Sequence, residues 1–257
     1  MFKAIRILVL LGILIMVAST TLFSRWSAQS WSRPQVVTLF PINAGADELT
    51  AAYLDRLDDQ AFARLEPFFR DQAQRYGISM AQPVRIVLGQ RVSVLPPAVP
   101  KERNMLTAIT WSLRMRWWAW RESPPSSPKP DVRLFLMYHP PDHAGALPHS
   151  TGLEKGRVGL VHLYAARSQQ GSNEVVIAHE ALHTFGATDK YDPFTLAPVA
   201  PDGYAEPDKS PLWPQSQAEL MAGRVPVRDG EARIPVGMAE VVIGPKTARE
   251  IGWVKGP

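Results

Sequence analysis

The segment HEALHTFGATDKYD, residues 179–192, places two histidines four residues apart, with a glutamate directly after the first. The apolar residues VVIA at 175–178 precede it, which predicts a helix whose start is buried and which continues through both histidines. Residues four apart on a helix lie on one face, so His179 and His183 can offer ring nitrogens to a single ion. Glu180 lies beside that face, where it can take a proton from a water at the ion's open position. The segment therefore predicts a metal centre with a general base.

The residues that follow extend this pattern toward a zinc site. Gly186 comes three residues after His183, where a glycine allows a helix to end with a positive φ. Asp189 comes three residues later and can return from that turn to supply an oxygen ligand. Two imidazoles, one carboxylate and a water make the open four-coordinate arrangement of a catalytic zinc. We predict one Zn²⁺ per chain, bound by His179, His183 and Asp189.

The stretch HEALHTFGATD, residues 179–189, resembles the metzincin signature, in which HExxHxxGxx ends in histidine or, in a minority of members, in aspartate. By this resemblance His179, His183 and Asp189 would be the zinc ligands and Glu180 the general base. The resemblance also implies an α+β fold, with a mixed sheet, an active-site helix and a loop-rich C-terminal subdomain.

Metzincins also place a methionine in a tight turn beneath the metal. Met221 in the stretch ELMAGR fits that role because Ala-Gly follows it, and Met238 is its rival. The tyrosine that often follows this methionine in the family is missing here. The aspartate at the third ligand position leaves Glu206 and Glu219 open as alternative ligands.

Tyr191 falls close to the predicted zinc ligands in the sequence. Its hydroxyl could donate a hydrogen bond to an oxyanion that develops during catalysis. Packing under the proline-rich loop that follows is the alternative role for this side chain.

Composition narrows the class of protein. The chain has 257 residues, of which 46% are hydrophobic and 20% charged, as expected for a globular protein with one sizeable domain or a domain plus an appendage. The net charge is +4 and the basic residues form no dense block, so we predict no nucleic-acid partner. The absence of cysteine excludes disulfides, thiolate zinc sites and cysteine nucleophiles.

The N-terminus predicts a membrane anchor. Lys3 and Arg6 precede seventeen uncharged residues at 7–23, a length at the lower limit for crossing a bilayer. The flanking positive charges favour a cytoplasmic N-terminus, which would place the rest of the chain in the periplasm or outside the cell. Signal-peptide cleavage near Ala28-Gln29-Ser30 is one alternative, and a buried helix of a soluble protein is another.

These boundaries divide the chain into three parts. Residues 1–23 are the predicted signal anchor, residues 24–34 a juxtamembrane linker, and residues 35–257 a zinc metallopeptidase-like domain. Trp26 and Trp31 in the linker suit the membrane interface.

Hydrophobic periodicity predicts the remaining elements of an α+β fold. We expect strands at 35–42, 84–95, 131–139 and 157–165, and helices at 46–76, 104–121, 173–185 and 245–252. The strand at 157–165 either forms the upper edge of a substrate cleft, where an extended peptide could add as another strand, or is an internal strand.

Two further patterns have a structural and a functional interpretation. The predicted helix at 104–121 carries one apolar stripe, which consists of Leu106, Ile109, Leu113, Trp117 and Trp120. We expect this stripe in the core rather than on a membrane surface. Trp111 and Trp118 are then expected to be exposed. His139, His143 and His149 are expected in a solvated loop rather than in a second metal site.

The sequence therefore predicts a membrane-anchored zinc endopeptidase in which Glu180 assists the attacking water. A zinc amidase or another hydrolase could use the same ligands, because they do not select the bond that is cleaved. A non-catalytic anchored binding protein with a structural zinc is the alternative outside enzymes.

Overall fold

A computed structural model of the chain describes residues 6, 11–12, 30–100, 104–143, 147–153 and 156–254. The predicted anchor over residues 1–23 lies outside these ranges except at residues 6, 11 and 12. Across the described ranges, no helix combines the length and the apolar character needed to span a bilayer.

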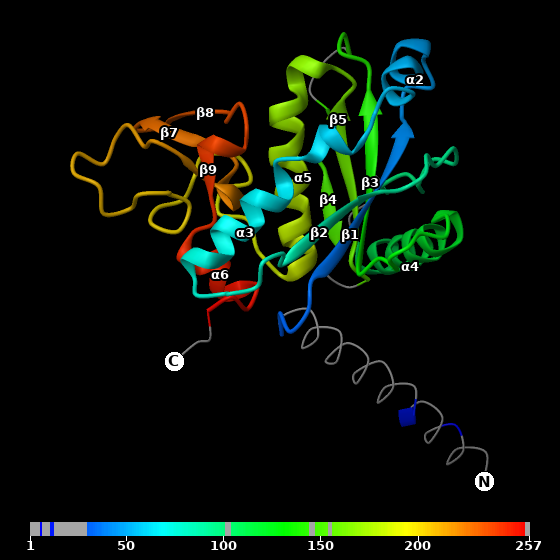
Figure 1. Ribbon diagram of the computed structural model, residues 1–257, viewed down its shortest axis with the longest axis horizontal. Coiled ribbons are helices and arrows are strands. Elements are labelled where there is room, and N and C mark those ends of the chain that lie inside the picture. The colour runs from blue at the N-terminus through cyan, green and yellow to red at the C-terminus, as the bar shows by residue number, and fades with distance from the viewer. Residues whose placement is uncertain are drawn as a thin grey trace.

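An α+β fold is built on a five-stranded mixed sheet with strand order β2–β1–β3–β5–β4 (Figure 1). Four strands are parallel and only β4, at the edge, is antiparallel to its neighbour. The central strands are apolar along their length because helices cover both faces. Their bounds are β1 Gln35–Asn43, β2 Val84–Leu88, β3 Val132–His139, β4 Thr151–Leu153 and β5 Val158–Tyr164.

The helices α3 (Leu65–Arg75) and α5 (Gln170–Phe185) pack on one face of the sheet, where their apolar side chains share a core with alternate residues of β1, β3 and β5. Helix α4 (Met105–Glu122) lies against the other face, over a smaller core that includes Phe40 and Phe135 (Figure 1). The short helix α2 (Glu48–Leu54) follows β1.

The C-terminal part after α5 is rich in loops, as expected. It contains two small sheets and a short closing helix, and its apolar residues join the same core as α5. The pairs are β6 Ala218–Glu219 with β9 Val241–Val242 and β7 Val225–Arg228 with β8 Glu231–Arg233, and α6 spans Pro245–Glu250.

The structure corrects the predicted elements at several places. The helix expected over 46–76 is divided into α2 and α3, because Asp58 caps a separate 3-10 turn at Asp59–Phe62 instead of continuing the helix. The strand expected over 84–95 ends at Leu88, where the chain packs Gly89 against Phe40. The strand expected over 157–165 is internal, because the unpredicted strand β4 forms the edge beyond it.

Trp31 is part of the core and does not face a membrane interface, which corrects its predicted role in the linker. Its side chain is buried, and its indole N–H donates to the carbonyl of Ile251 at 2.7 Å. The ring packs edge-on against Phe185 and Trp253, with centroids 5.2 and 5.5 Å away. The packed core therefore includes a residue of the predicted linker and joins it to both α5 and the C-terminal segment.

Replacing Trp31 with phenylalanine is expected to lower the free energy of unfolding by about 1–3 kcal/mol, because the buried carbonyl of Ile251 loses its donor. Equilibrium unfolding in urea measures this change. The matched control is Trp120→Phe at an exposed position, which should change stability by less than about 0.5 kcal/mol. Equal effects at both positions would contradict the buried role of Trp31.

Candidate metal centre

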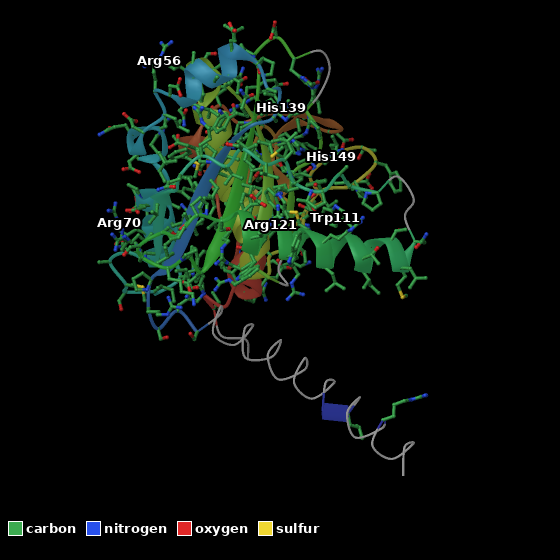
Figure 2. All side chains as sticks on the ribbon, turned by 90° about the vertical axis from the view of Figure 1, so that its right-hand side faces the viewer. Arg56, Arg70, Trp111, Arg121, His139 and His149 are labelled. Carbon is green, nitrogen blue, oxygen red and sulfur yellow. The ribbon has the colours of Figure 1, made fainter. Side chains whose placement is uncertain are left out.

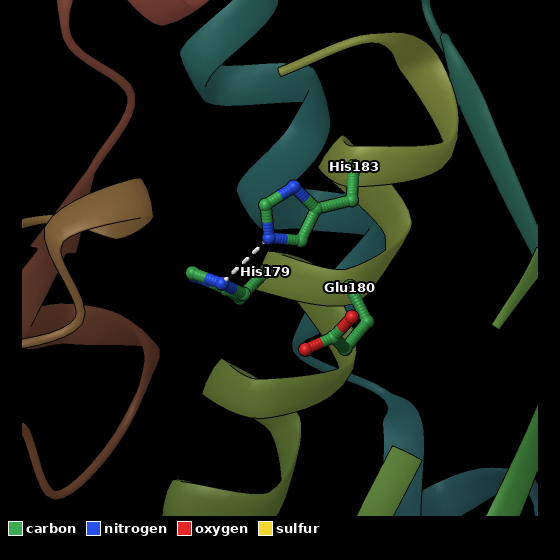
Figure 3. Close-up of side chains that lie close together, drawn as sticks. All are labelled: His179, Glu180 and His183. Atoms are coloured by element: carbon green, nitrogen blue, oxygen red, sulfur yellow. Dashed lines mark hydrogen bonds between the residues drawn. The ribbon is translucent and has the colours of Figure 1, made fainter. Parts of the chain in front are cut away.

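Helix α5 carries His179 and His183 on one face, with the carboxylate of Glu180 beside them (Figure 3). The Nε2 atoms of the two rings lie 3.0 Å apart. The Nδ1 atom of His179 lies 3.0 Å from the carbonyl oxygen of Leu220, and that of His183 lies 2.9 Å from the carbonyl oxygen of Ala187. Because a carbonyl can only accept, each Nδ1 carries a proton, which leaves Nε2 as the atom of each ring that can bind a metal.

The end of α5 brings Asp189 to these two nitrogens. Gly186 adopts a left-handed conformation with φ of 107°, and its N–H bonds the carbonyl of His183, so the helix stops and the chain reverses. The Oδ1 atom of Asp189 then lies 3.2 Å from Nε2 of His179 and 3.1 Å from Nε2 of His183. The three predicted ligand atoms form one tight triangle.

This donor set fits a zinc ion. Ligand atoms about 2.0–2.2 Å from a tetrahedral zinc lie roughly 3.3 Å apart, close to the separations of the three atoms here. Two imidazoles and one carboxylate are common zinc ligands. The Asp189 side chain is 40% exposed, so the triangle is open to solvent on one side, as a catalytic site requires.

Glu180 is buried beside the triangle with an oxygen that lacks a partner. Its side chain is 4% exposed, and among the described residues Oε2 has no hydrogen-bond donor. Burial raises the pKa of this carboxyl group, while His179 and His183 oppose the shift. Native proteins seldom leave a buried carboxylate oxygen unpaired, so this atom is suited to receive a proton from a bound water.

Electrostatics favour a cation inside the triangle. Burial opposes the charged form of His179, but the hydrogen bond to Asp189, the charges of Glu180 and Asp189 and the contact with the carbonyl of Leu220 together raise the pKa of His179 to about 9. Burial likewise disfavours the Asp189 carboxylate, yet the two histidines hold its pKa well below the usual range. Asp189 is therefore ionised and pairs with a protonated His179 at the place where an ion would bind.

The carbonyl that orients His179 belongs to a tight turn, Leu220–Ala222, in which Met221 is fully buried. The carbonyl of Met221 accepts from the N–H of Lys190 at 2.9 Å, so the turn also contacts the loop that carries Asp189. Met221 thus lies in a turn beside the candidate ligands. Its rival Met238 lies in a second short turn, Met238–Glu240, which also packs near α5.

Glu219 holds this turn in place. The sequence analysis did not predict this role and offered Glu219 only as an alternative metal ligand. Its carboxylate accepts from the N–H groups of Met221, Ala222 and Gly244 and from the hydroxyl of Thr247, at 2.6–3.1 Å. The side chain is fully buried, and its oxygens are used by these four donors. The other alternative ligand, Glu206, accepts from the N–H of Ser216 at 2.7 Å. The sequence did contain one indication of this role, because Glu219 directly precedes a tight turn that ends at Gly223.

A buried lysine fixes the loop around Asp189. The Nζ atom of Lys190 lies 2.7 Å from the Glu250 carboxylate on α6 and 2.6 Å from the carbonyl oxygen of Thr188. Thr188 donates through its own N–H and hydroxyl to the same carboxylate. These contacts hold the residues on both sides of Asp189, so α6 contributes to the position of this candidate ligand.

Tyr191 lies near the same carboxylates. Burial, the charge of Asp189 and a hydrogen bond to that carboxylate together raise the pKa of Tyr191 to about 12. The hydroxyl therefore stays protonated at neutral pH and can donate a hydrogen bond, as its predicted supporting role requires.

The edge strand β4 touches the site at Gly152. A Cβ atom at this position would lie 2.6 Å from Cβ of His183 and 2.9 Å from the carbonyl oxygen of Glu180. Only glycine allows the strand to approach α5 this closely. The sequence patterns did not predict β4 or this contact, because a strand of three residues shows no clear hydrophobic periodicity.

The substitution Gly152→Ala is expected to lower the free energy of unfolding by about 1–3 kcal/mol and to weaken the predicted zinc binding, because the added methyl group displaces α5 at the turn that carries Glu180 and His183. Urea unfolding and a zinc titration measure the two effects. The control is Gly237→Ala, where the new Cβ would meet its nearest neighbour only at 3.7 Å. A Gly152→Ala protein as stable as the parent would disprove the close contact.

The remaining histidines are only partly solvated. His139 is buried, which corrects its expected place in a solvated loop, and its Nε2 lies 2.9 Å from Nδ1 of His162. The ring of His143 lies 5.1 Å from that of His139, whereas His149 is exposed (Figure 2). Among the described residues, His179, Glu180 and His183 on α5 are the one group of three such side chains that lie close enough together to hold an ion.

Burial and, to a smaller extent, the neighbouring His139 lower the pKa of His162 to about 4. The unfolded chain takes up this proton near pH 6.5 and the folded chain near pH 4, so stability should fall as pH falls through that window. The slope is at most about 1.4 kcal/mol per pH unit, reduced by screening because the ring is partly exposed. Urea unfolding at several pH values should show a shallower slope for His162→Gln and an unchanged slope for His149→Gln.

A scan of the sequence against models of known protein families finds no match, and a search of curated proteins finds no significant relative. Any function must therefore be argued from the chemistry of the site itself.

Proposed function

We propose that this protein is a zinc-dependent endopeptidase with a metzincin-like fold. His179, His183 and Asp189 would hold one Zn²⁺, and Glu180 would act as the general base. The observation that carries the proposal is the buried Glu180 carboxylate, with one unpaired oxygen, next to two histidines whose Nε2 atoms converge on Asp189. A purely structural zinc site has no use for such a group, because burying a carboxylate that is not fully paired costs stability.

The surroundings of the site support the metzincin-like assignment. The candidate ligands come from a helix that packs on a mixed sheet, and the chain turns at Gly186 to present the third ligand. A buried methionine lies in a tight turn whose backbone orients the first histidine. The C-terminal part that supplies this turn is rich in loops, as the resemblance implies.

In this mechanism, a bound zinc would polarise the scissile carbonyl and lower the pKa of the attacking water. Glu180 accepts a proton from that water as its oxygen bonds to the carbonyl carbon. The same carboxyl group then delivers the proton to the nitrogen of the leaving amine as the C–N bond breaks. Tyr191 would donate a hydrogen bond to the oxyanion that forms between these two steps.

The position of β4 favours an extended peptide as substrate. Within the described sheet, β4 pairs with β5 on one side only, and its other edge keeps backbone groups that a peptide could bind as an added strand. Gly152 places this edge directly beside Glu180. A peptide bound along β4 would therefore present its backbone to the general base.

The sequence of residues 1–23 supports a membrane anchor, so the proposed enzyme acts at a membrane. The charges of Lys3 and Arg6 would keep the N-terminus in the cytoplasm and place the catalytic domain in the periplasm or outside the cell. Its substrates would then be peptides or proteins of that compartment.

The test is cleavage of an unbiased peptide library by the zinc-loaded full chain in detergent, with Glu180→Gln as the matched control. The full chain is used because Trp31 belongs to the core, so a truncation at residue 34 would remove part of it. Cuts made by the parent and absent from the variant would support the proposal. If both proteins bind zinc and neither cuts, the endopeptidase assignment fails, and amide substrates other than peptides would distinguish an amidase from a structural zinc protein.

A further inference from the structure

The apolar stripe of helix α4, which we predicted to lie in the core, is exposed. Its members are between 50% and 75% exposed, whereas Trp118, expected at the surface, is 5% exposed. Trp111 is half-buried, and its indole N–H donates to the carbonyl of Pro97. The exposed side chains are Leu106, Ile109, Leu113, Trp117 and Trp120.

The stripe points directly away from the body of the protein. Met115, Trp118 and Ala119 form the buried side of α4, which packs against β1 and β3. At about 100° per residue, the exposed stripe lies on the opposite side of the helix. Figure 2 shows α4 extending outward from the body, with Trp111 and Arg121 labelled along it.

Positive charges flank this apolar face. Arg116 lies on one side of the stripe, and Arg114 and Arg121 lie on the other, as the same helical geometry requires. The only acidic residue of α4, Glu122, is paired with Arg121 at 2.7 Å. The guanidinium of Arg121 also lies 4.8 Å from the centre of the Trp117 ring. Apolar side chains with tryptophan and arginine at their margins match the boundary between the acyl chains and anionic headgroups of a bilayer.

The predicted anchor would bring α4 close to such a surface. The core begins at Trp31, and the apolar run at 7–23 ends shortly before it, so residues 24–30 can separate them by at most roughly 25 Å. Residue Val37 near the start of β1 pairs with Val132 at the start of β3, the strand that follows α4. Both views place α4 toward this end of the sheet (Figures 1 and 2).

We infer that α4 is a second membrane contact, which lies in the interface of an anionic bilayer with its apolar stripe among the lipids. The predicted anchor holds the domain near the membrane, and α4 sets its orientation. The inference does not depend on zinc or on catalysis, so the variant Glu180→Gln should dock in the same way.

Because the chain has no cysteine, one introduced cysteine gives one labelled site. The probe is a spin label at Leu113→Cys, in the full chain reconstituted into vesicles of phosphatidylcholine and phosphatidylglycerol. Leu49→Cys on α2 is the matched control, because Leu49 is an equally exposed leucine far from α4. The measurement is the ratio of two collision rates of the spin label. One is the rate with oxygen, which concentrates in lipid, and the other is the rate with a water-soluble nickel chelate.

We expect an oxygen-to-nickel ratio at position 113 that is roughly threefold or more above that at position 49. Adding Ile109→Glu at a second exposed site of the stripe should return the ratio at 113 to the control value, with circular dichroism confirming that the fold is kept. Equal ratios at 113 and 49 in the parent would overturn the inference. So would a label at 113 that neither reagent reaches, because a second copy or another segment of the chain would then cover α4.

Discussion

Replacing Glu180 with glutamine is expected to lower the turnover of any peptide that the protein cleaves by about 10²–10⁴-fold, because the amide cannot take a proton from the attacking water. The bound zinc should remain, since Glu180 is not among the three atoms that form the ligand triangle. The variant should be at least as stable as the parent, because the substitution removes a buried carboxylate that lacks a full set of partners. Turnover on a cleaved peptide, zinc content and urea unfolding measure these three results.

The matched control lies on the same helix. Glu174 is also buried, but its carboxylate is paired with Arg64 at 2.6 Å. Glu174→Gln should lose stability and keep its turnover, which is the reverse of the pattern expected for Glu180→Gln. A Glu180→Gln protein that keeps its turnover, or that loses its zinc together with its activity, would refute the role of Glu180 as the general base.

Replacing Glu219 with alanine is expected to lower the free energy of unfolding by about 3–5 kcal/mol, because it leaves four buried donors without their acceptor. The same change should weaken zinc binding by roughly 10–100-fold, since the turn would no longer hold the carbonyl of Leu220 against His179. Urea unfolding and competition with a zinc chelator measure the two effects. Glu219→Gln should lie between the parent and Glu219→Ala, because it keeps one acceptor oxygen.

Two controls separate a turn-forming glutamate from a metal ligand. Glu206→Ala removes a more exposed carboxylate that accepts from one backbone N–H and should cost about 1 kcal/mol or less. Asp189→Ala should lose zinc with a smaller loss of stability, because its side chain is partly exposed. If Glu219→Ala lost zinc completely while keeping its stability, Glu219 rather than Asp189 would be the third ligand.

Much of the candidate site could be predicted from the sequence because its parts are local. The spacing of His179 and His183 needs only one turn of helix, and Gly186 ends that helix within three residues. Asp189 follows in the same reversal and so comes near the histidines, although contacts of Thr188 and Lys190 with the distant Glu250 also hold its loop. The strands β1, β3 and β5 were also predictable, because they are buried along their length and rich in β-branched and aromatic residues.

The contacts that orient these residues join distant parts of the chain, and local patterns do not report them. Leu220 orients His179 from 41 positions away. Gly152 brings a strand of three residues against α5, and Trp31 contacts Ile251 across 220 positions. Each contact depends on how elements pack after they have formed, so neither periodicity nor composition indicates it.

Helix α4 shows most clearly which features the sequence determines and which depend on tertiary packing. Its sequence determined that it is a helix, since Asn104 caps its start and apolar residues recur at helical spacing. It carries apolar side chains on two opposite faces, however, so periodicity cannot indicate which face is buried. Only the tertiary structure decided that Met115, Trp118 and Ala119 pack on the sheet. The physical reason is that burial depends on the surface opposite the helix, and that surface comes from strands elsewhere in the chain.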